Sequence, residues 1–407
     1  MTTAERDPRL QVDPEGLAGL WTRFTRRVRQ GELGSLPVII GLVVIWLYFS
    51  LTEENFLTSG NLTNLMLQIT PLGIIAVGVV LVLLLGEIDL SVGVVSGVAA
   101  ACMAVLSVNH GWSGWPAILV AVFVVGLGIG LFQGVFVAYF QVPSFVVTLA
   151  GLLGFQGLLL YVLGDTGTVN ITDDTILDLA NTFYSDAVGW IIAIVLLVPY
   201  VLMTVWGYRR RVTSGLETVP IILVGIRIAV VVLGTLAAVA VLNDDRGVPL
   251  AVLIFIGIVI VVDFITRRTA FGRHVYAVGG NAEAARRAGI SLSRIRLIVF
   301  GAAATLAAIG GVMAASRLFA VNQGSGGGDE LLNAIAAAVI GGTSLFGGRG
   351  TAWSALLGAL VIGSISNGMD LKALDSDVKF MVTGAVLLLA VTVDATARRG
   401  RRSAGRA

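Results

Sequence analysis

The stretch LLLGEIDLSVGVVSG places two carboxylates, Glu87 and Asp89, between apolar runs that no real loop separates. Charged side chains in or near a membrane interior are costly, and they often mark the pathway of an ion, a proton or a polar solute. The same two residues could instead end helices at the membrane interface, and both interpretations stay open. A third carboxylate, Asp263, lies four residues before Arg267, and this helical spacing favours an interfacial ion pair.

Residues that could support catalysis are sparse. The two histidines, His110 and His274, fall in separate polar segments, so we expect neither a metal cluster nor an acid–base pair. The stretch GGTSLFGGRGT is rich in glycine like a phosphate-binding loop. The motif fails, because Gly348 and Arg349 follow Gly347 where a lysine and a serine or threonine are needed. We therefore expect no catalytic residue, no metal site and no cofactor bound by this chain.

The densest group of charges lies in FGRHVYAVGGNAEAARRAGISLSRIR, residues 271–296, with five arginines, a histidine and a glutamate. Asn281 can cap a helix there, and Glu283 falls in the first turn, where a negative charge suits the helix dipole. Arg286 falls in the last turn, and Gly289 can adopt the left-handed backbone that ends a helix. The segment predicts a helix of about two turns, which is too short to be stable alone.

Small side chains dominate this predicted helix. Ala284 and Ala285 favour helix formation without adding a large apolar face. Such a helix presents a knob, which suggests that it fits into a groove of another protein. An ordinary basic loop, kept on one side of the membrane by its charge, explains the same residues equally well. The residue types alone leave both interpretations open.

The composition around these segments is that of a membrane protein. Hydrophobic residues make up 56% and charged residues 13% of the 407 residues, against about 25% charged residues in soluble domains. Mean hydropathy is +0.92, and apolar runs of about 20 residues recur, the length that crosses a hydrocarbon core. The net charge is +2, and the single cysteine, Cys102, excludes an intramolecular disulfide. We predict an all-α polytopic membrane protein.

Polar breaks divide the chain into about 12 transmembrane helices, with about 10 as the lower bound because two apolar runs are short. The transmembrane domain covers 36–394, between a tail at 1–35 and a basic tail at 395–407. It includes an acidic loop at 164–187 and a basic loop at 266–294. The predicted crossings are 36–51, 64–86, 90–108, 115–138, 144–163, 188–206, 219–242, 249–265, 295–315, 331–346, 351–368 and 378–394.

The basic residues orient these crossings. Placing the N-terminus in the cytoplasm and alternating puts most of the 27 basic residues on the cytoplasmic side. Positive charge in short cytoplasmic loops is the known orienting signal. We therefore predict that both termini and the loop 266–294 are cytoplasmic and that the loop 164–187 is external. The external side keeps only four basic residues, Arg246, Arg317, Lys372 and Lys379.

Three further segments concern packing and external contacts. Gly126, Gly130 and Gly134 lie four residues apart on one helix face, a spacing that lets helices approach closely in lipid. The glycine cluster in 316–330 allows either a flexible linker or a folded re-entrant turn. The loop 164–187 has five aspartates and no basic residue, and is either a solvated lid or a docking surface for an external partner.

Five stretches in order along the chain resemble the permeases of ABC-type monosaccharide importers, and together they span nearly all of it. The resemblance is greatest to xylose-type members, which have an extra membrane stretch, here within 188–245. Glu87 departs from the ribose-type pattern, which usually has glycine there, and this leaves the sugar open. The stretches are NFLTSGNLTNLMLQ (55–68), GEIDLSVGVVSG (86–97), VPSFVVTLAG (142–151), GRHVYAVGGNAEAARRAGIS (272–291) and IAAAVIGGTSLFGGRGT (335–351).

The resemblance implies a permease homodimer in the lipid of a bacterial inner membrane, with no nucleic-acid partner. Two ATP-binding cassettes, often fused in one polypeptide, would bind ATP and Mg²⁺ and dock on the cytoplasmic side. An external sugar-binding protein would deliver the sugar. The residues that it implies for coupling to the cassettes are Gly279, Asn281, Glu283, Ala284, Ala285, Arg286 and Gly289.

Polar residues in or at the ends of the crossings are candidates for the solute pathway or the family signature, although hydrogen bonds between helices explain each as well. Two alternatives to the sugar importer remain. One is an ABC permease for a nucleoside or another small polar solute. The other, of a different class, is an ion-coupled secondary transporter that uses Glu87 and Asp89. The candidates are Gln68, Glu87, Asp89, Ser91, Gln133 and Asn333.

Overall fold

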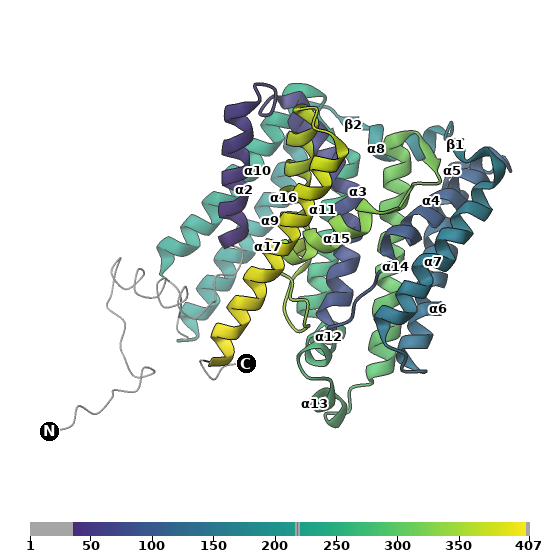
Figure 1. Cartoon of the computed structure of the whole chain (residues 1–407). Coiled ribbons are helices and arrows are strands. Elements are labelled where there is room, and N and C mark those ends of the chain that lie inside the picture. Colours follow the sequence, from purple (N-terminus) through teal and green to yellow (C-terminus); the bar gives the residue numbers. More distant parts are fainter. Residues whose placement is uncertain (1–35, 216–217, 219, 404–407) are drawn as a thin grey trace.

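The computed structural model of the chain describes residues 36–215, 218 and 220–403, and this part is almost entirely helical (Figure 1). The predicted tail at 1–35 lies outside the described residues, as do residues 404–407 of the predicted basic tail. The last helix, α17 (Ser376–Ser403), continues nine residues beyond the predicted boundary at 394. The all-helical class predicted from composition is therefore confirmed for the described chain.

Each predicted crossing overlaps a helix. The long helices in chain order are α2 (Leu36–Thr52), α3 (Ser59–Leu84), α4 (Val92–Val108), α5 (Gly114–Leu119) continued by the π-helical stretch η2 (Val120–Gly126) and α6 (Leu127–Ala138), α7 (Ser144–Leu163), α9 (Asp186–Thr213), α10 (Ile221–Asp245), α11 (Leu250–Arg268), α14 (Leu292–Leu318), α15 (Asp329–Ile340), α16 (Ala352–Leu371) and α17.

Eight of these helices, within the described residues, are long and apolar enough to cross a membrane, and α2 and α4 are shorter apolar helices. The count of about 12 crossings therefore stays a prediction. The crossing expected at 331–346 is wrong in its second half, because α15 ends at Ile340 and spans only about 18 Å. Glycines follow it, and Gly342, Gly347 and Gly348 have positive φ, which a helix cannot accommodate.

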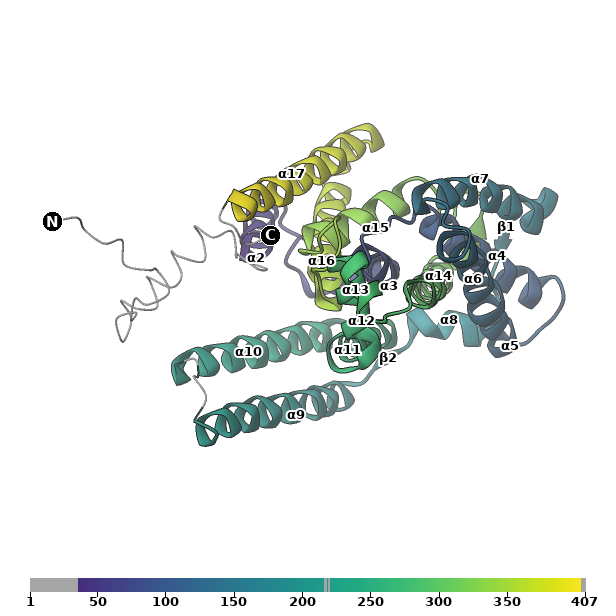
Figure 2. The same ribbon diagram turned by 90° about the horizontal axis from the view of Figure 1, so that it is seen from below.

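Helices α3 and α14 form the centre of the bundle (Figure 2). The most apolar window of α3 is 83% buried and that of α14 is 67% buried, whereas that of α10 is not buried at all. Helices α9 and α10 project from the bundle as a hairpin. This hairpin covers most of 188–245, where the resemblance to xylose-type permeases predicted an extra membrane stretch.

Glycines set how closely the helices approach. A Cβ atom at Gly130 would lie 2.5 Å from the carbonyl oxygen of Phe300, so α6 packs directly on the backbone of α14. Gly126 and Gly134 also face α14, which confirms that this glycine row serves packing. Helices α15 and α16 are closer still, because a Cβ at Gly358 would lie 1.7 Å from the carbonyl oxygen of Ala337.

Two short antiparallel pairs tie the connecting segments together at one end of the bundle. Strand β1 (Thr168–Asn170) pairs with β4 (Ala320–Asn322), and β2 (Phe183–Tyr184) pairs with β3 (Val248–Pro249). The short helices η3 (Gly164–Thr166) and α8 (Asp174–Asn181) complete this end. The segment 316–330 is therefore a folded turn, and its Gly326 packs against α4, which decides between the two predicted possibilities.

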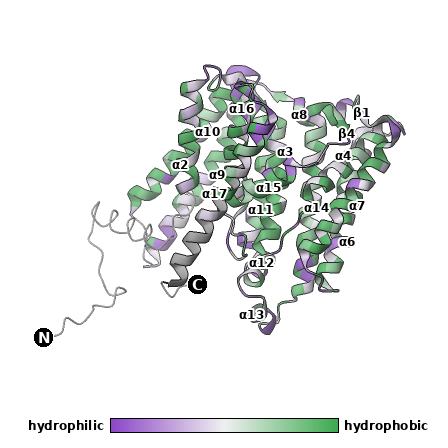
Figure 3. Ribbon diagram, in the orientation of Figure 1, coloured by the Kyte–Doolittle hydropathy of each residue, from purple (hydrophilic) through white to green (hydrophobic). Residues whose placement is uncertain are grey.

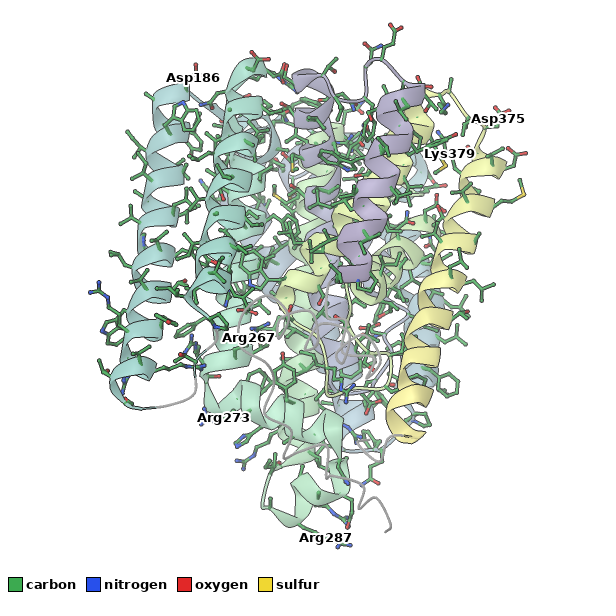
Figure 4. All side chains as sticks on the ribbon, turned by 90° about the vertical axis from the view of Figure 1, so that its left-hand side faces the viewer. Asp186, Arg267, Arg273, Arg287, Asp375 and Lys379 are labelled. Atoms are coloured by element: carbon green, nitrogen blue, oxygen red, sulfur yellow. The ribbon has the colours of Figure 1, made fainter. Side chains whose placement is uncertain are left out.

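Charge separates the two ends of the molecule. Figure 4 places Arg267, Arg273 and Arg287 at one end and Asp186 and Asp375 at the other. Figure 3 shows apolar helices between polar ends. We call the first end, which carries the short helices α12 (Ala270–Gly280) and α13 (Ala282–Arg287), the arginine end, and the second the acidic end. That the arginine end faces the cytoplasm remains a prediction from the charge distribution.

Replacing Gly358 by alanine tests the contact between α15 and α16. The added methyl group would overlap the Ala337 carbonyl, so we expect a loss of about 1–3 kcal/mol in the free energy of unfolding. The measurement is the melting temperature of the purified protein in detergent. Gly128→Ala on α6 is the matched control, because nothing lies within 4 Å of its added Cβ. Equal melting temperatures for both variants would contradict the packing.

Candidate functional site

The charged segment at the arginine end folds as two consecutive short helices. Thr269 begins α12 by accepting a hydrogen bond from the Gly272 backbone N–H through its hydroxyl oxygen, at 3.3 Å. Asn281 begins α13 in the same way, with its side-chain oxygen 2.9 Å from the Ala284 nitrogen. The prediction that Asn281 caps a helix is therefore confirmed. The two caps let the chain turn sharply between helices without leaving backbone N–H groups unpaired.

Helix α13 projects from the arginine end (Figure 1). Glu283 in its first turn pairs with Arg286 at 2.9 Å and with Arg287 at 3.1 Å. Gly289 has φ +83° and ends the helix, as predicted. Ala285 is buried, whereas Ala284 and both arginines are exposed. The helix is thus fixed on one side and leaves a small polar surface free, while its docking role stays a prediction.

Helix α12 is joined to the membrane core by direct contact between backbones. A Cβ atom at Gly279 would lie 1.7 Å from the carbonyl oxygen of Leu84, which ends α3. The Gly348 backbone N–H donates to the same Leu84 oxygen at 2.9 Å. A Cβ at Gly347 would lie 2.6 Å from the Gly279 carbonyl oxygen and 2.9 Å from the Gly86 nitrogen. We call Gly86, Gly279, Gly347 and Gly348 the glycine junction.

The glycine junction was not predicted, apart from Gly279. The sequence shows its signal in GGTSLFGGRGT, whose glycines are needed for the approach of three backbone segments. Tyr276 of α12 supports the same contact, because its hydroxyl donates to the Gly350 carbonyl at 2.7 Å. Burial raises the pKa of this phenol, so it stays protonated and remains a donor. The segment 341–350 is thus bound to α12 at two points.

Glu87 forms an ion pair with Arg296 near the start of α14, at 2.9 Å. The two side chains are 16% and 26% exposed, so the pair lies in a partly closed environment. It connects the segment between α3 and α4 to the helix that follows α13. Arg296 was not among the predicted site residues, although it ends the charged stretch 271–296. Asp263 pairs with Arg267 at 2.9 Å, as the helical spacing indicated.

Asp89, Ser91 and Gln133 come together in a closed buried cluster. One Asp89 oxygen accepts from the Ser91 backbone nitrogen at 2.8 Å and from its hydroxyl at 2.7 Å. The Gln133 amide nitrogen lies 2.8 Å from the Ser91 oxygen. All three side chains are 4% exposed or less. The cluster fixes the start of α4 against α6.

The other predicted polar residues lie elsewhere. Gln68 accepts from Asn367 at 3.4 Å, and Asn367 also pairs with Asn61. This cluster joins α3 to α16 towards the acidic end. Asn333 on α15 is half-buried and makes no side-chain hydrogen bond within the described part of the chain. The structure therefore divides the predicted pathway residues among Glu87, the Asp89 cluster, Gln68 and Asn333.

The ion pair of Glu87 and the Asp89 cluster hold segments of the chain in place, and the exposed helix α13 offers a surface for binding. Among residues 36–215, 218 and 220–403, no group of three His, Cys, Asp or Glu residues could hold a metal ion. The two carboxylates predicted as pathway candidates, Glu87 and Asp89, are already paired or hydrogen-bonded. The arrangement joins an exposed helix at the arginine end to the segments that begin α4 and follow α15.

Reversing the charge of Glu87 tests its ion pair. Glu87→Arg would place two cations together. We expect the free energy of unfolding to fall by an amount between about 1 kcal/mol, as for exposed pairs, and about 3 kcal/mol, as for buried pairs. The double variant Glu87→Arg with Arg296→Glu should recover part of the melting temperature in detergent. Glu283→Gln breaks exposed pairs and should leave that temperature unchanged. No recovery in the double variant would contradict the pairing.

Comparisons with known proteins agree along most of the chain. The family model described as branched-chain amino acid transport system / permease component matches residues 61–391. The xylose transport system permease protein XylH of Escherichia coli (strain K12) is 40% identical over 365 residues, which cover 89% of this chain and 92% of that protein. XylH of Haemophilus influenzae is 37% identical over 89% of this chain and 96% of that protein.

A ribose relative is more distant. The ribose import permease protein RbsC of Escherichia coli (strain K12) is 31% identical over 360 residues, 88% of this chain and 92% of that protein. No solved structure gives a significant match. The helical bundle, the charged helix at the arginine end and these matches agree, and the chain belongs to the family described as branched-chain amino acid transport system / permease component.

Proposed function

We propose that this chain is the transmembrane permease subunit of an ATP-binding-cassette importer for a monosaccharide, xylose or a similar pentose or hexose. The identity of 40% with a xylose permease, across 89% of the chain, is the observation that carries this proposal. The hairpin of α9 and α10 lies where xylose-type permeases were expected to have an additional membrane stretch. The protein lies in the bacterial inner membrane as a multi-pass protein.

The energy comes from partner subunits. Two ATP-binding cassettes bind ATP and Mg²⁺ and receive α13 in a groove, where Glu283, Ala284 and Gly289 lie at the contact. A second copy of the chain completes the membrane unit, surrounded by lipid. An external sugar-binding protein docks on the acidic end, where the aspartates of 164–187 attract basic residues.

The proposed cycle uses the contacts of the arginine end. Closure of the cassettes on ATP pulls α13, and α12 transmits the movement because Gly279 in its last turn lies against the Leu84 carbonyl. Movement of Gly279 then displaces both the segment after α3 and the loop around Gly348. These displacements open the pathway outwards, and ATP hydrolysis resets it.

The alternatives receive less support. An ion-coupled transporter that uses Glu87 and Asp89 is not favoured, because Glu87 is paired with Arg296 and Asp89 accepts two hydrogen bonds. An ABC permease for a nucleoside keeps the same mechanism and differs only in the solute. No observation favours it over a sugar.

Uptake assays test the function directly. A bacterial strain that lacks this chain, and the same strain complemented with it, are given labelled xylose, ribose, galactose, glucose and a nucleoside, each with and without ATP depletion. We expect the complemented strain to take up one monosaccharide only while ATP is present. Restored uptake of the nucleoside alone would overturn the sugar. Uptake that follows an ion gradient after ATP depletion would overturn the ABC mechanism.

Substitutions in α13 test the docking. Glu283→Lys reverses a charge on the exposed face, and Gly289→Pro removes the left-handed end of the helix. Both variants should reach the membrane, yet lose at least about tenfold in uptake rate, as expected when docking loses about 1.4 kcal/mol. The measurements are membrane abundance by immunoblotting and initial uptake rate.

The matched control for Glu283→Lys is Arg211→Glu, an exposed charge reversal at the same end but on α9, outside the segment 266–294. We expect this variant to keep normal uptake. Equal uptake in Glu283→Lys, Gly289→Pro and the control would refute docking through α13 and leave the uptake function itself standing.

A further inference from the structure

A small cavity lies on the acidic side of the bundle, between α4, the last turns of α14 and the start of α15. Its volume is about 200 Å³. Polar groups and glycine backbone line one part, and alanines with Leu318 line the other. Among the residues that line it are Ser96, Ala100, Ala315, Leu318, Ser325 and Glu330.

Among the described residues that line this cavity, Glu330 is the only charged one. Its carboxylate oxygen lies 3.4 Å from the Ser96 hydroxyl, which already donates to the Gly93 carbonyl at the shorter distance of 2.6 Å. A half-buried carboxylate has several acceptor positions, and leaving these without donors is costly. Within the described part of the chain Glu330 has no ion pair and no second side-chain hydrogen bond. The geometry therefore leaves acceptors directed at the cavity.

The cavity lies beside two discontinuous helices. α4 begins only at Val92, after the segment that holds Glu87 and Asp89, and Ser96 is in its second turn. α15 has only 12 residues and begins beside the glycine turn 324–328, with Glu330 in its first turn. Short helices that end inside the membrane form the solute sites of many transporters, because their ends supply polar groups at that depth.

The folded turn forms the outer wall. A Cβ atom at Gly97 would lie 2.1 Å from the Ser325 carbonyl oxygen, and one at Gly326 would lie 2.1 Å from the Gly93 carbonyl oxygen. The turn thus packs on α4 at Gly93 and Gly97, next to the cavity. Asn333 lies one helical turn after Glu330, half-buried and without a side-chain partner in the described chain. Both residues therefore point from one side of α15.

The chemistry of the lining selects a ligand class. No group of three acidic, His or Cys residues occurs within the described ranges, so the cavity lacks the ligand set of a typical protein zinc site. What Glu330 lacks is hydrogen-bond donors, and neighbouring hydroxyl groups of a sugar supply two of them at adjacent positions. The wall of Ala100, Ala315 and Leu318 suits the C–H face of a sugar ring.

We propose that this cavity is a monosaccharide-binding subsite on the acidic side of the pathway, in which Glu330 accepts hydrogen bonds from sugar hydroxyls. Ser96 adds a hydroxyl contact, and Asn333 offers the next polar contact along α15. The proposal rests on the proposed function, because it assigns a place within this chain to the transported sugar.

Cysteine protection tests the subsite in the full chain. Cys102→Ala removes the single cysteine, and Leu318→Cys then adds a reporter at a cavity-lining position that is 59% exposed. In right-side-out membrane vesicles we expect D-xylose, D-ribose or D-glucose to slow labelling of this cysteine by a polar maleimide. Glu330→Gln should raise the sugar concentration needed for half-protection by about tenfold, the effect of losing one hydrogen bond to a charged group.

Two controls accompany the test. Asp329→Asn removes the adjacent, exposed carboxylate from the same first turn of α15 and should leave protection unchanged. A cysteine at Asn109, at the end of α4 and outside the cavity, should be labelled equally with and without sugar. Protection that is the same with Glu330→Gln, or no protection by any of the three sugars, would overturn the subsite. Protection by Na⁺ alone would also overturn it.

Uptake in the same cells separates the two proposals. ATP-dependent sugar uptake by the Cys102→Ala chain, with no protection of the reporter, would refute only the subsite. Protection without ATP-dependent uptake would instead refute the importer function and leave the sugar contact standing.

Discussion

Direct contact between backbones at glycine is the constraint on which this structure depends. In lipid, burying one apolar side chain against another brings little gain, so helices associate through close packing and hydrogen bonds. Here helices approach closely where a Cβ atom has no room, as at Gly279 against Leu84, at Gly358 against Ala337 and at Gly311 against Ser96. The same lack of side chains joins α12 to the core, α15 to α16 and α14 to α4.

This packing makes short helices inside the bundle possible. Non-helical backbone at membrane depth is tolerated only where protein or water pairs its polar groups. The start of α4 meets that condition, because Asp89 pairs with Ser91 and Ser91 with Gln133. The end of α3 meets it through the hydrogen bond from Gly348 to the Leu84 carbonyl. At these two places, hydrogen bonds therefore pair the polar groups where α4 begins and α3 ends.

Sequence periodicity and charge predicted most of what is local. The helical class, the ends of most helices, the Asn281 cap and the pair of Asp263 with Arg267 depend on neighbours a few residues apart. Contacts between distant segments were not predictable in this way, because no local pattern connects Glu87 to Arg296 or Gly279 to Leu84. Likewise, hydropathy extends the crossing at 331–346 through Leu345 and Phe346, while glycine conformation ends α15 at Ile340.

Two helices, α4 and α15, each connect the arginine end to the cavity. α4 begins after Gly86, and α15 is followed by the loop of Gly347 and Gly348, so both lead back to the glycine junction. α4 and α15 also meet at the cavity, where the Ser96 hydroxyl of α4 donates to the Glu330 carboxylate of α15. Close-packed elements move together, because backbone atoms that are already in contact cannot be compressed further. In the proposed cycle, a displacement of Gly279 therefore reaches both walls of the cavity through these contacts, whereas the hairpin of α9 and α10 projects from the bundle and lies outside them.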